Sequence, residues 1–236
     1  MTIPVSFLEI EHHVNEAPSD ESKQDNWHPD FDALSCGNDQ KEKKEVVDNS
    51  KNFLPSSILD PDQKQQLLKG YKEILGSQSK ALMQKTLNGK WTCIHSTTEK
   101  MGPPSQFQGI WSTIANQGPV FMLLTGSNQT HQNIVYGGFC QKAFPPVGDV
   151  DNEYGVSKTP GDFLFASIKD KGLGFYDHDG SVMLEVISDY EGGGSISIGQ
   201  DFFNISYSYD YALVVGVTQG LDSIKVNGVP DANKEL

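Results

Sequence analysis

After Pro55, apolar residues recur at helical spacing, and residues that favour helix ends flank them. Ser57 or Asp60 can cap a helix with Pro61 at its first position. A second helix is expected from Lys80 to Leu87, before the turn pair Asn88-Gly89. We interpret both helices as packing on a core, with partner binding as the less favoured alternative. The apolar positions of the first helix are Leu67, Leu68, Tyr71, Ile74 and Leu75, and Gly76 is expected to end it.

From Gly89 onward the pattern changes to short apolar runs separated by clusters of Gly, Pro, Asn and Asp. Such runs predict strands in an α+β, mainly β protein: two packed antiparallel sheets, a β-sandwich, with short peripheral helices and an N-terminal helical segment. One further helix is expected at Phe107–Ala115. The predicted strands are 91–95, 120–124, 134–139, 163–168, 173–176, 182–187, 195–198, 211–217 and 224–226.

Residues 1–54 mix charge, Asn, Ser and Pro without a sustained period, which is typical of a segment that does not fold alone. We expect an acidic, irregular N-terminal arm held in part by a protein partner. The remaining predicted units are a helical segment at 55–88, the sandwich domain at 89–229 and a C-terminal tail at 230–236.

The charge of the chain is strongly acidic and unevenly distributed. The formal net charge is -13, and every one of the 18 basic residues is lysine. Residues 51–100 carry eight lysines against four acids, whereas the segments on either side are acidic. The lysines can contact these acidic segments within the molecule, which we favour, or bind an acidic partner. Without arginine the chain lacks planar bidentate grips on phosphate and guanine, so we expect no nucleic-acid partner.

Three widely spaced cysteines point to a reducing compartment, and the lack of a long apolar segment argues against membrane insertion. Cys36, Cys93 and Cys140 form neither a CxxC pair nor a disulfide framework. No window approaches the roughly 20 apolar residues that a membrane span needs. We therefore expect a cytoplasmic protein without membrane insertion, and a cilium or the cytoskeleton is the alternative location.

Specific residues accompany the predicted order of elements between 91 and 226. In chain order they are Trp91-Thr92-Cys93-Ile94, Phe107, the Gly118-Pro119 step into a hydrophobic strand, Tyr136-Gly137-Gly138-Phe139, Asp162 to Ile168, Glu191 to Ile198 and Ser223 to Val226. This succession resembles the TLDc domain family. The chain departs from the family pattern in its first loop, Glu99 to Gly102, and at Phe144, where the family has a tryptophan.

The resemblance implies a β-sandwich with short helices, in a family linked to oxidative-stress resistance and, for several members, to binding of the vacuolar proton pump (V-ATPase). It implies no catalytic residues. We therefore expect a non-enzymatic protein-binding protein docked on a large assembly, with neither cofactor nor metal. A ciliary, axonemal or other cytoskeletal assembly is the alternative to the proton pump, and the oligomeric state stays open.

Two glycine runs are expected to serve the backbone. Gly137-Gly138 and Gly192-Gly193-Gly194 are interpreted as places of positive φ or close strand approach. Phosphate binding is disfavoured, because neither run has the spacing of a phosphate loop.

Thiol chemistry forms a competing hypothesis, whereas metal binding is disfavoured. Cys140 or Cys93 could serve a redox sensor or enzyme, with His95 or His131 as the base for Cys140. Asp177-His178-Asp179-Gly180 is interpreted as a hairpin turn, since Ser188 stands where an EF-hand needs an acid. Two further groups offer metal-capable atoms without ligand spacing: His12-His13, and His28, Asp30 and Asp32 with Cys36.

Aromatic residues provide the candidate partner surface. The run from 201 to 211 is rich in Phe and Tyr, which are favoured at interfaces, although core strand residues explain half of it. The candidate partner-binding residues are Trp27, Phe31, Phe203, Tyr207 and Tyr209.

Overall fold

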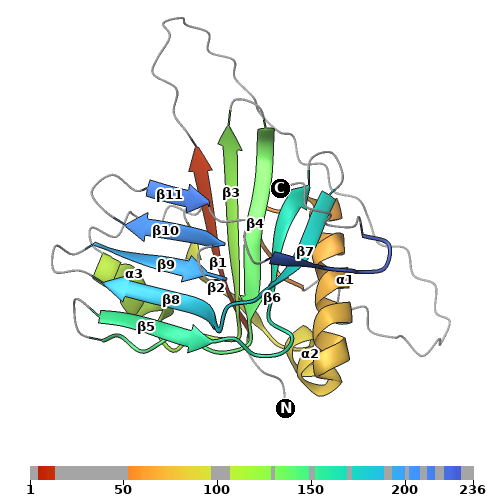
Figure 1. Cartoon of the computed structure of the whole chain (residues 1–236), viewed down its shortest axis with the longest axis horizontal. Helices are drawn as coiled ribbons and strands as arrows, with labels where there is room; N and C mark the ends of the chain where they lie inside the picture. Colours follow the sequence, from red (N-terminus) through yellow and green to blue (C-terminus); the bar gives the residue numbers. More distant parts are fainter. Residues whose placement is uncertain are drawn as a thin grey trace, which may run out of the picture.

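The computed structural model describes residues 5–13, 53–96, 107–128, 131–148, 152–168, 172–188, 193–199, 202–207, 212–215 and 221–229. Figure 1 labels the elements within these ranges. They are β1 Val5–His13, α1 Pro61–Gln78, α2 Lys80–Leu87, β2 Trp91–Ser96, α3 Phe107–Ile114, β3 Val120–Asn128, β4 His131–Cys140, β5 Asn152–Ser157, β6 Phe163–Ile168, β7 Gly172–His178, β8 Val182–Ser188, β9 Gly194–Ile198, β10 Phe203–Tyr207, β11 Ala212–Val215 and β12 Leu221–Ile224.

The predicted helices are present, and local capping sets their ends. Asp60 accepts a hydrogen bond from the Gln63 backbone N–H at 2.8 Å, and the Gln63 side chain accepts one from the Asp60 N–H at 3.2 Å. This is a capping box, and Pro61 is the first residue of the helix. The predicted stop at Gly76 is wrong: α1 continues to Gln78, and the hydroxyl of Ser79 then caps α2.

Two sheets form the body of the described chain, as the sequence predicts. The seven-stranded sheet has the order β12-β7-β6-β4-β3-β1-β2, and the five-stranded sheet the order β11-β10-β9-β8-β5. All pairs are antiparallel except two, because β1 runs parallel to both β2 and β3. Strands β5 and β10 are absent from the predicted set, and β12 ends at Ile224, where the predicted last strand begins.

The N-terminal strand corrects the expected arm. Residues 5–13 lie between β2 and β3 inside the large sheet, with Ser6 opposite Val120 and Val5 opposite Trp91. Val5, Phe7 and Leu8 are buried. A nine-residue stretch too short to fold alone is therefore a central strand, because its partners are supplied from far along the chain.

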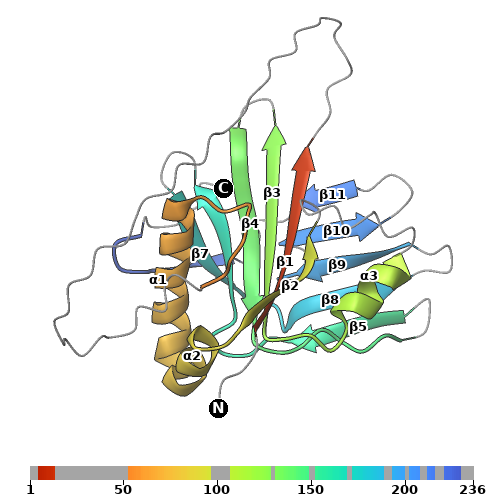
Figure 2. The ribbon, with the colours of Figure 1, turned by 180° about the vertical axis from the view of Figure 1, so that it is seen from behind.

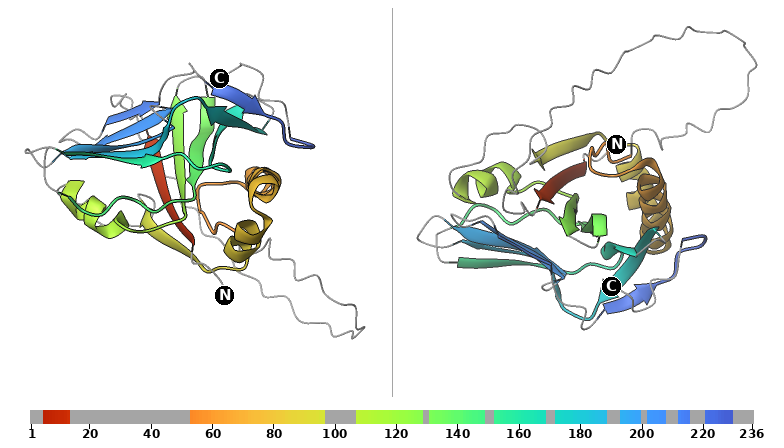
Figure 3. Two further views of the ribbon diagram at one scale, coloured as in Figure 1. Left: turned by 60° about the horizontal axis from the view of Figure 1, so that its bottom comes forward. Right: turned by 90° about the horizontal axis from the view of Figure 1, so that it is seen from above.

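The sheets and helices stack in three layers. Figures 1 and 2 show the strands of the small sheet crossing those of the large sheet steeply, with α1 on the opposite face of the large sheet. Figure 3 shows α3 at the open end of the sandwich, where it contacts β2 and β9. Alternating residues of each central strand thus face two different cores.

The two cores differ in their side chains. Between the sheets lie mostly aliphatic residues, including Met122, Leu164 and Ile196. Between the large sheet and α1 lies an aromatic cluster, in which the ring centroids of Phe121 and Phe139 are 4.8 Å apart. Its other rings include Phe53, Tyr71, Trp91, Phe163, Phe165 and Phe175. The helical segment and the sandwich therefore share one core.

Candidate functional site

The predicted partner-binding residues lie in two parts of the chain. Trp27, Phe31 and Tyr209 are outside the described residues. Phe203 and Tyr207 are the first and last residues of β10, each two positions from the buried Ile205. Within the run from 201 to 211, Phe202 and Ile205 are buried, and the side chains of Phe203 and Tyr207 lie outside what the structure describes. The partner surface itself stays a prediction.

Close strand approach explains the first glycine run. A Cβ on Gly137 would collide with the carbonyl oxygen of Met122 and the ring of Phe165, and one on Gly138 would lie 2.6 Å from Ile198 Cδ1. Neither glycine has a positive φ. In the second run, Gly194 begins β9 opposite Ser188 and Tyr207, Gly193 precedes it, and Gly192 is outside the described residues.

The structure separates Cys140 from both histidines proposed as its base. Strands β3 and β1 lie between Cys140 and His95, which places their backbones at least about 14 Å apart. His131 is nine residues away along the same strand. Burial, reinforced by Asp162, raises the pKa of the Cys140 thiol to about 12. Cys140 is therefore held as a neutral core thiol.

Cys93 is more accessible than Cys140. It is half-buried on β2, and its Sγ lies 3.4 Å from the carbonyl oxygen of His95. Burial lowers the pKa of His95. The third cysteine, Cys36, is outside the described residues.

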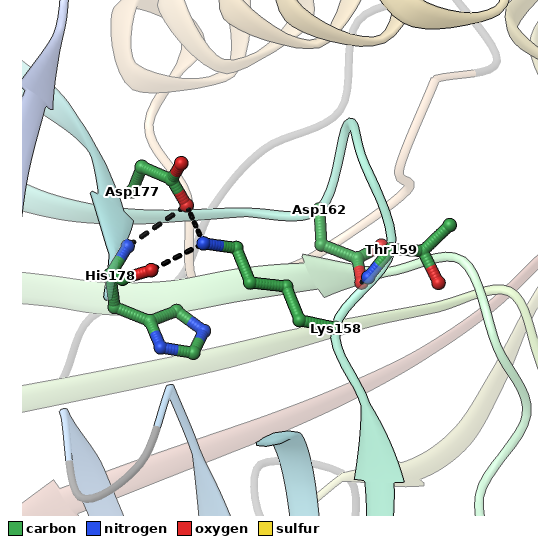
Figure 4. Close-up of polar contacts among 5 residues, drawn as sticks. All are labelled: Lys158, Thr159, Asp162, Asp177 and His178. Carbon is green, nitrogen blue, oxygen red and sulfur yellow. Dashed lines mark hydrogen bonds and ion pairs between the residues drawn. The ribbon is translucent and has the colours of Figure 1, made fainter. Parts of the chain in front are cut away.

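Two polar crossovers meet at one corner of the sandwich (Figure 4). Residues 158–162 carry the chain from β5 in the small sheet to β6 in the large sheet, and residues 179–181 carry it from β7 back to β8. The predicted hairpin at Asp177–Gly180 is therefore wrong, because β7 and β8 belong to different sheets. A turn-rich sequence does not say whether the next strand pairs with the last one.

Lys158 ties the two crossovers together. Its ammonium group contacts the carboxylate of Asp177 and the carbonyl oxygen of His178, as Figure 4 shows, and its backbone N–H donates to the Ser181 carbonyl at 2.8 Å. The side chain of Asp177 is about half exposed, so the ion pair contributes at most about 1 kcal/mol. The ion pair therefore positions the two crossovers but adds little to the free energy of unfolding.

Asp162 organises the first crossover from inside. Its carboxylate accepts hydrogen bonds from the backbone N–H groups of Thr159, at 2.7 Å, and Gln141, at 2.8 Å. Burial raises the pKa of this carboxyl group, and the two N–H donors oppose the shift. Asp162 thus holds the loop against β4.

His178 is the unusual member of this corner. It is 5% exposed, and among the described residues neither ring nitrogen has a hydrogen-bond partner. Burial, and secondarily the charge of Lys158, lowers its pKa. The imidazole is thus kept neutral at physiological pH.

A buried carboxylate that sequence reasoning missed connects β1 to the chain before α1. Glu9 is 2% exposed. It accepts hydrogen bonds from the hydroxyls of Ser56 (2.6 Å), Ser57 (2.9 Å) and Ser96 (2.9 Å), and from the Ser57 N–H (3.2 Å). The alternation of β1 gave no signal for it, since Glu9 resembles any acidic residue of the expected arm.

The small sheet has an outer face, opposite the core, that is lined by polar residues and one isoleucine. We define this outer face by Glu153, Glu185, Ile187, Ser195, Ser197 and Asn204. Ile187 is 37% exposed and lies opposite Glu153 on β5 and Ser195 on β9. Val147 is the other large hydrophobic residue exposed in the described part of the chain. An apolar residue in mid-sheet with acidic neighbours is suited to contact with another molecule.

The described residues contain no group of three or more His, Cys, Asp and Glu placed to hold a metal ion. Within the same ranges, no helix is long and apolar enough to cross a membrane. His28, Asp30 and Asp32 lie outside them.

Comparison with known proteins gives no identification: no family model, no curated protein and no solved structure matches this chain.

Proposed function

We propose that this chain is a non-enzymatic, TLDc-like protein that binds other proteins and docks on a large intracellular assembly. The resemblance of residues 91–226 suggests the role that several family members have, which is binding to the vacuolar proton pump. The fold that the resemblance implies and the sheets described above agree in class, which supports the proposal without identifying the family.

The outer face of the small sheet carries the proposal. Ile187 remains exposed beside Glu153, whereas Leu184 and Val186 on the other face of β8 are buried in the core. Exposed apolar positions rimmed by charge are common where partners bind, although single exposed apolar residues also occur on ordinary surfaces.

Density-gradient sedimentation of the endogenous tagged protein, followed by mass spectrometry of co-migrating fractions, tests the proposal. Co-migration with proton-pump subunits supports the family role, and co-migration with tubulin and axonemal proteins supports the cytoskeletal alternative. Migration as a free chain near its own mass of 26.0 kDa would refute docking on a stable assembly.

A further inference from the structure

Strand β5 ends the small sheet. It pairs with β8 on one side, and among the described residues no strand pairs with its other side. The register with β8 shifts between Val156 and Ser157, so the regular part of the edge is Asn152–Val156. An open edge of this kind can accept an added strand from another chain.

The edges of the large sheet are different. Strand β2 contacts α3, and β12 is a four-residue strand with exposed Asp222 and Ser223. Strand β5 carries neither lysine nor proline, two residue types that commonly protect sheet edges.

The side chains beside β5 favour a basic segment. Glu153 is exposed on β5 and opposes Ile187, while the exposed Gly155 opposes Glu185. Because Gly155 has no side chain, a lysine or arginine from an added strand can extend across it, about 10 Å, toward Glu185. The stem of that side chain would then pass the methyl groups of Val182, which lie 3.6 and 3.7 Å from the position of a Cβ at Gly155.

We propose that the β5 edge binds an extended, lysine- or arginine-rich segment of a partner protein by strand addition. This inference rests on the proposed function and gives it a surface and a partner chemistry. A second copy of the chain is disfavoured as the occupant, because its β5 would bring another Glu153 to the interface and each copy carries a net charge of -13.

The test uses the full chain and a fluorescein-labelled hexapeptide of alternating lysine and valine, with binding followed by fluorescence anisotropy. Glu153→Lys is compared with Asp222→Lys, which makes the same charge change at an exposed edge position of the other sheet. We expect Glu153→Lys to weaken binding at least about fivefold and Asp222→Lys less than about twofold. A version of the peptide with alternate backbone nitrogens methylated keeps its charge but cannot add as a strand on its methylated edge, and we expect it to bind at least about fivefold more weakly.

Strand addition at β5 would be overturned if the two substitutions weakened peptide binding equally. It would also be overturned if the methylated peptide bound as tightly as the unmethylated one. Failure of this inference is distinguishable from failure of the proposed function by sedimentation of Glu153→Lys in cells. If wild type and variant both co-migrate with an assembly, docking stands and the β5 surface is wrong. If the wild type migrates alone, the proposed function fails.

Discussion

Replacing Glu9 with alanine should destabilise the protein strongly. Its buried carboxylate accepts hydrogen bonds from three serine hydroxyls and one backbone N–H. A hydrogen bond to a charged group contributes about 1.5–3 kcal/mol, and a donor left buried without a partner costs about 1–3 kcal/mol.

These contributions are not additive in this case. Ser56 and Ser57 lie near the surface and can hydrogen-bond to water after the substitution, whereas Ser96 is 1% exposed and cannot. Counting full loss for Ser96 and partial loss for the other donors, we expect Glu9→Ala to lower the free energy of unfolding by about 3–4 kcal/mol.

Urea unfolding followed by tryptophan fluorescence measures the effect. Glu153→Ala is the matched control: it removes the same carboxylate from an exposed strand position and should change stability by less than about 0.5 kcal/mol. Ser96→Ala should cost about 1.5–3 kcal/mol in the wild type and much less when Glu9 is already alanine. Two results would refute the reasoning. One is a free energy of unfolding for Glu9→Ala within about 1 kcal/mol of that of the control; the other is additive losses for the Glu9 and Ser96 substitutions.

Three further predictions concern other parts of the fold. Because burial holds the pKa of His178 below its ordinary value of 6.5, the unfolded chain takes up the proton first, so wild-type stability should fall as pH drops below 6.5. His178→Gln should show a smaller loss between pH 8 and pH 5.5 in urea unfolding, and identical losses would contradict the assignment. In native protein at pH 8, iodoacetamide should modify Cys93 and leave Cys140 unmodified until urea is added, as read by mass spectrometry; rapid native labelling of Cys140 would revive the redox hypothesis. Gly137→Ala should cost at least about 2 kcal/mol by steric collision, whereas Gly155→Ala, whose Cβ would meet its nearest neighbour at 3.6 Å, should be close to neutral; equal thermal stabilities would show that the strands can separate.

Local patterns predicted the elements that depend on local chemistry. Asp60 and Pro61 set the start of α1, and short apolar runs between turn residues set most strands of both sheets. The helix stop at Gly76 failed because a glycine inside a helix costs only about 1 kcal/mol, less than the packing of Leu75 beside it.

Elements that depend on distant partners were not predictable. Val5–His13 has strand-like residues but no neighbour in sequence with which to pair, so composition placed it in an arm. The contact between Lys158 and Asp177 was likewise not predictable, because it depends on β7 and β8 lying in different sheets. For the candidate site, the exposure of Ile187 follows from which face of β8 meets the core, and alternation alone does not assign the face.

The position of β1 also affects the order of events during synthesis. From His13 to Trp91 is 78 residues, and β3 follows later still, so at about 5–20 residues per second β1 waits about 4–16 s on the ribosome for its first partner. Helices α1 and α2 emerge within this interval and can form locally. Meanwhile both edges of β1 are open to other nascent chains, and Glu9 and Glu11 place charges within it. The Glu9 carboxylate, which hydrogen-bonds to three serines in the folded protein, is thus also suited to keep the unpaired strand from aggregating.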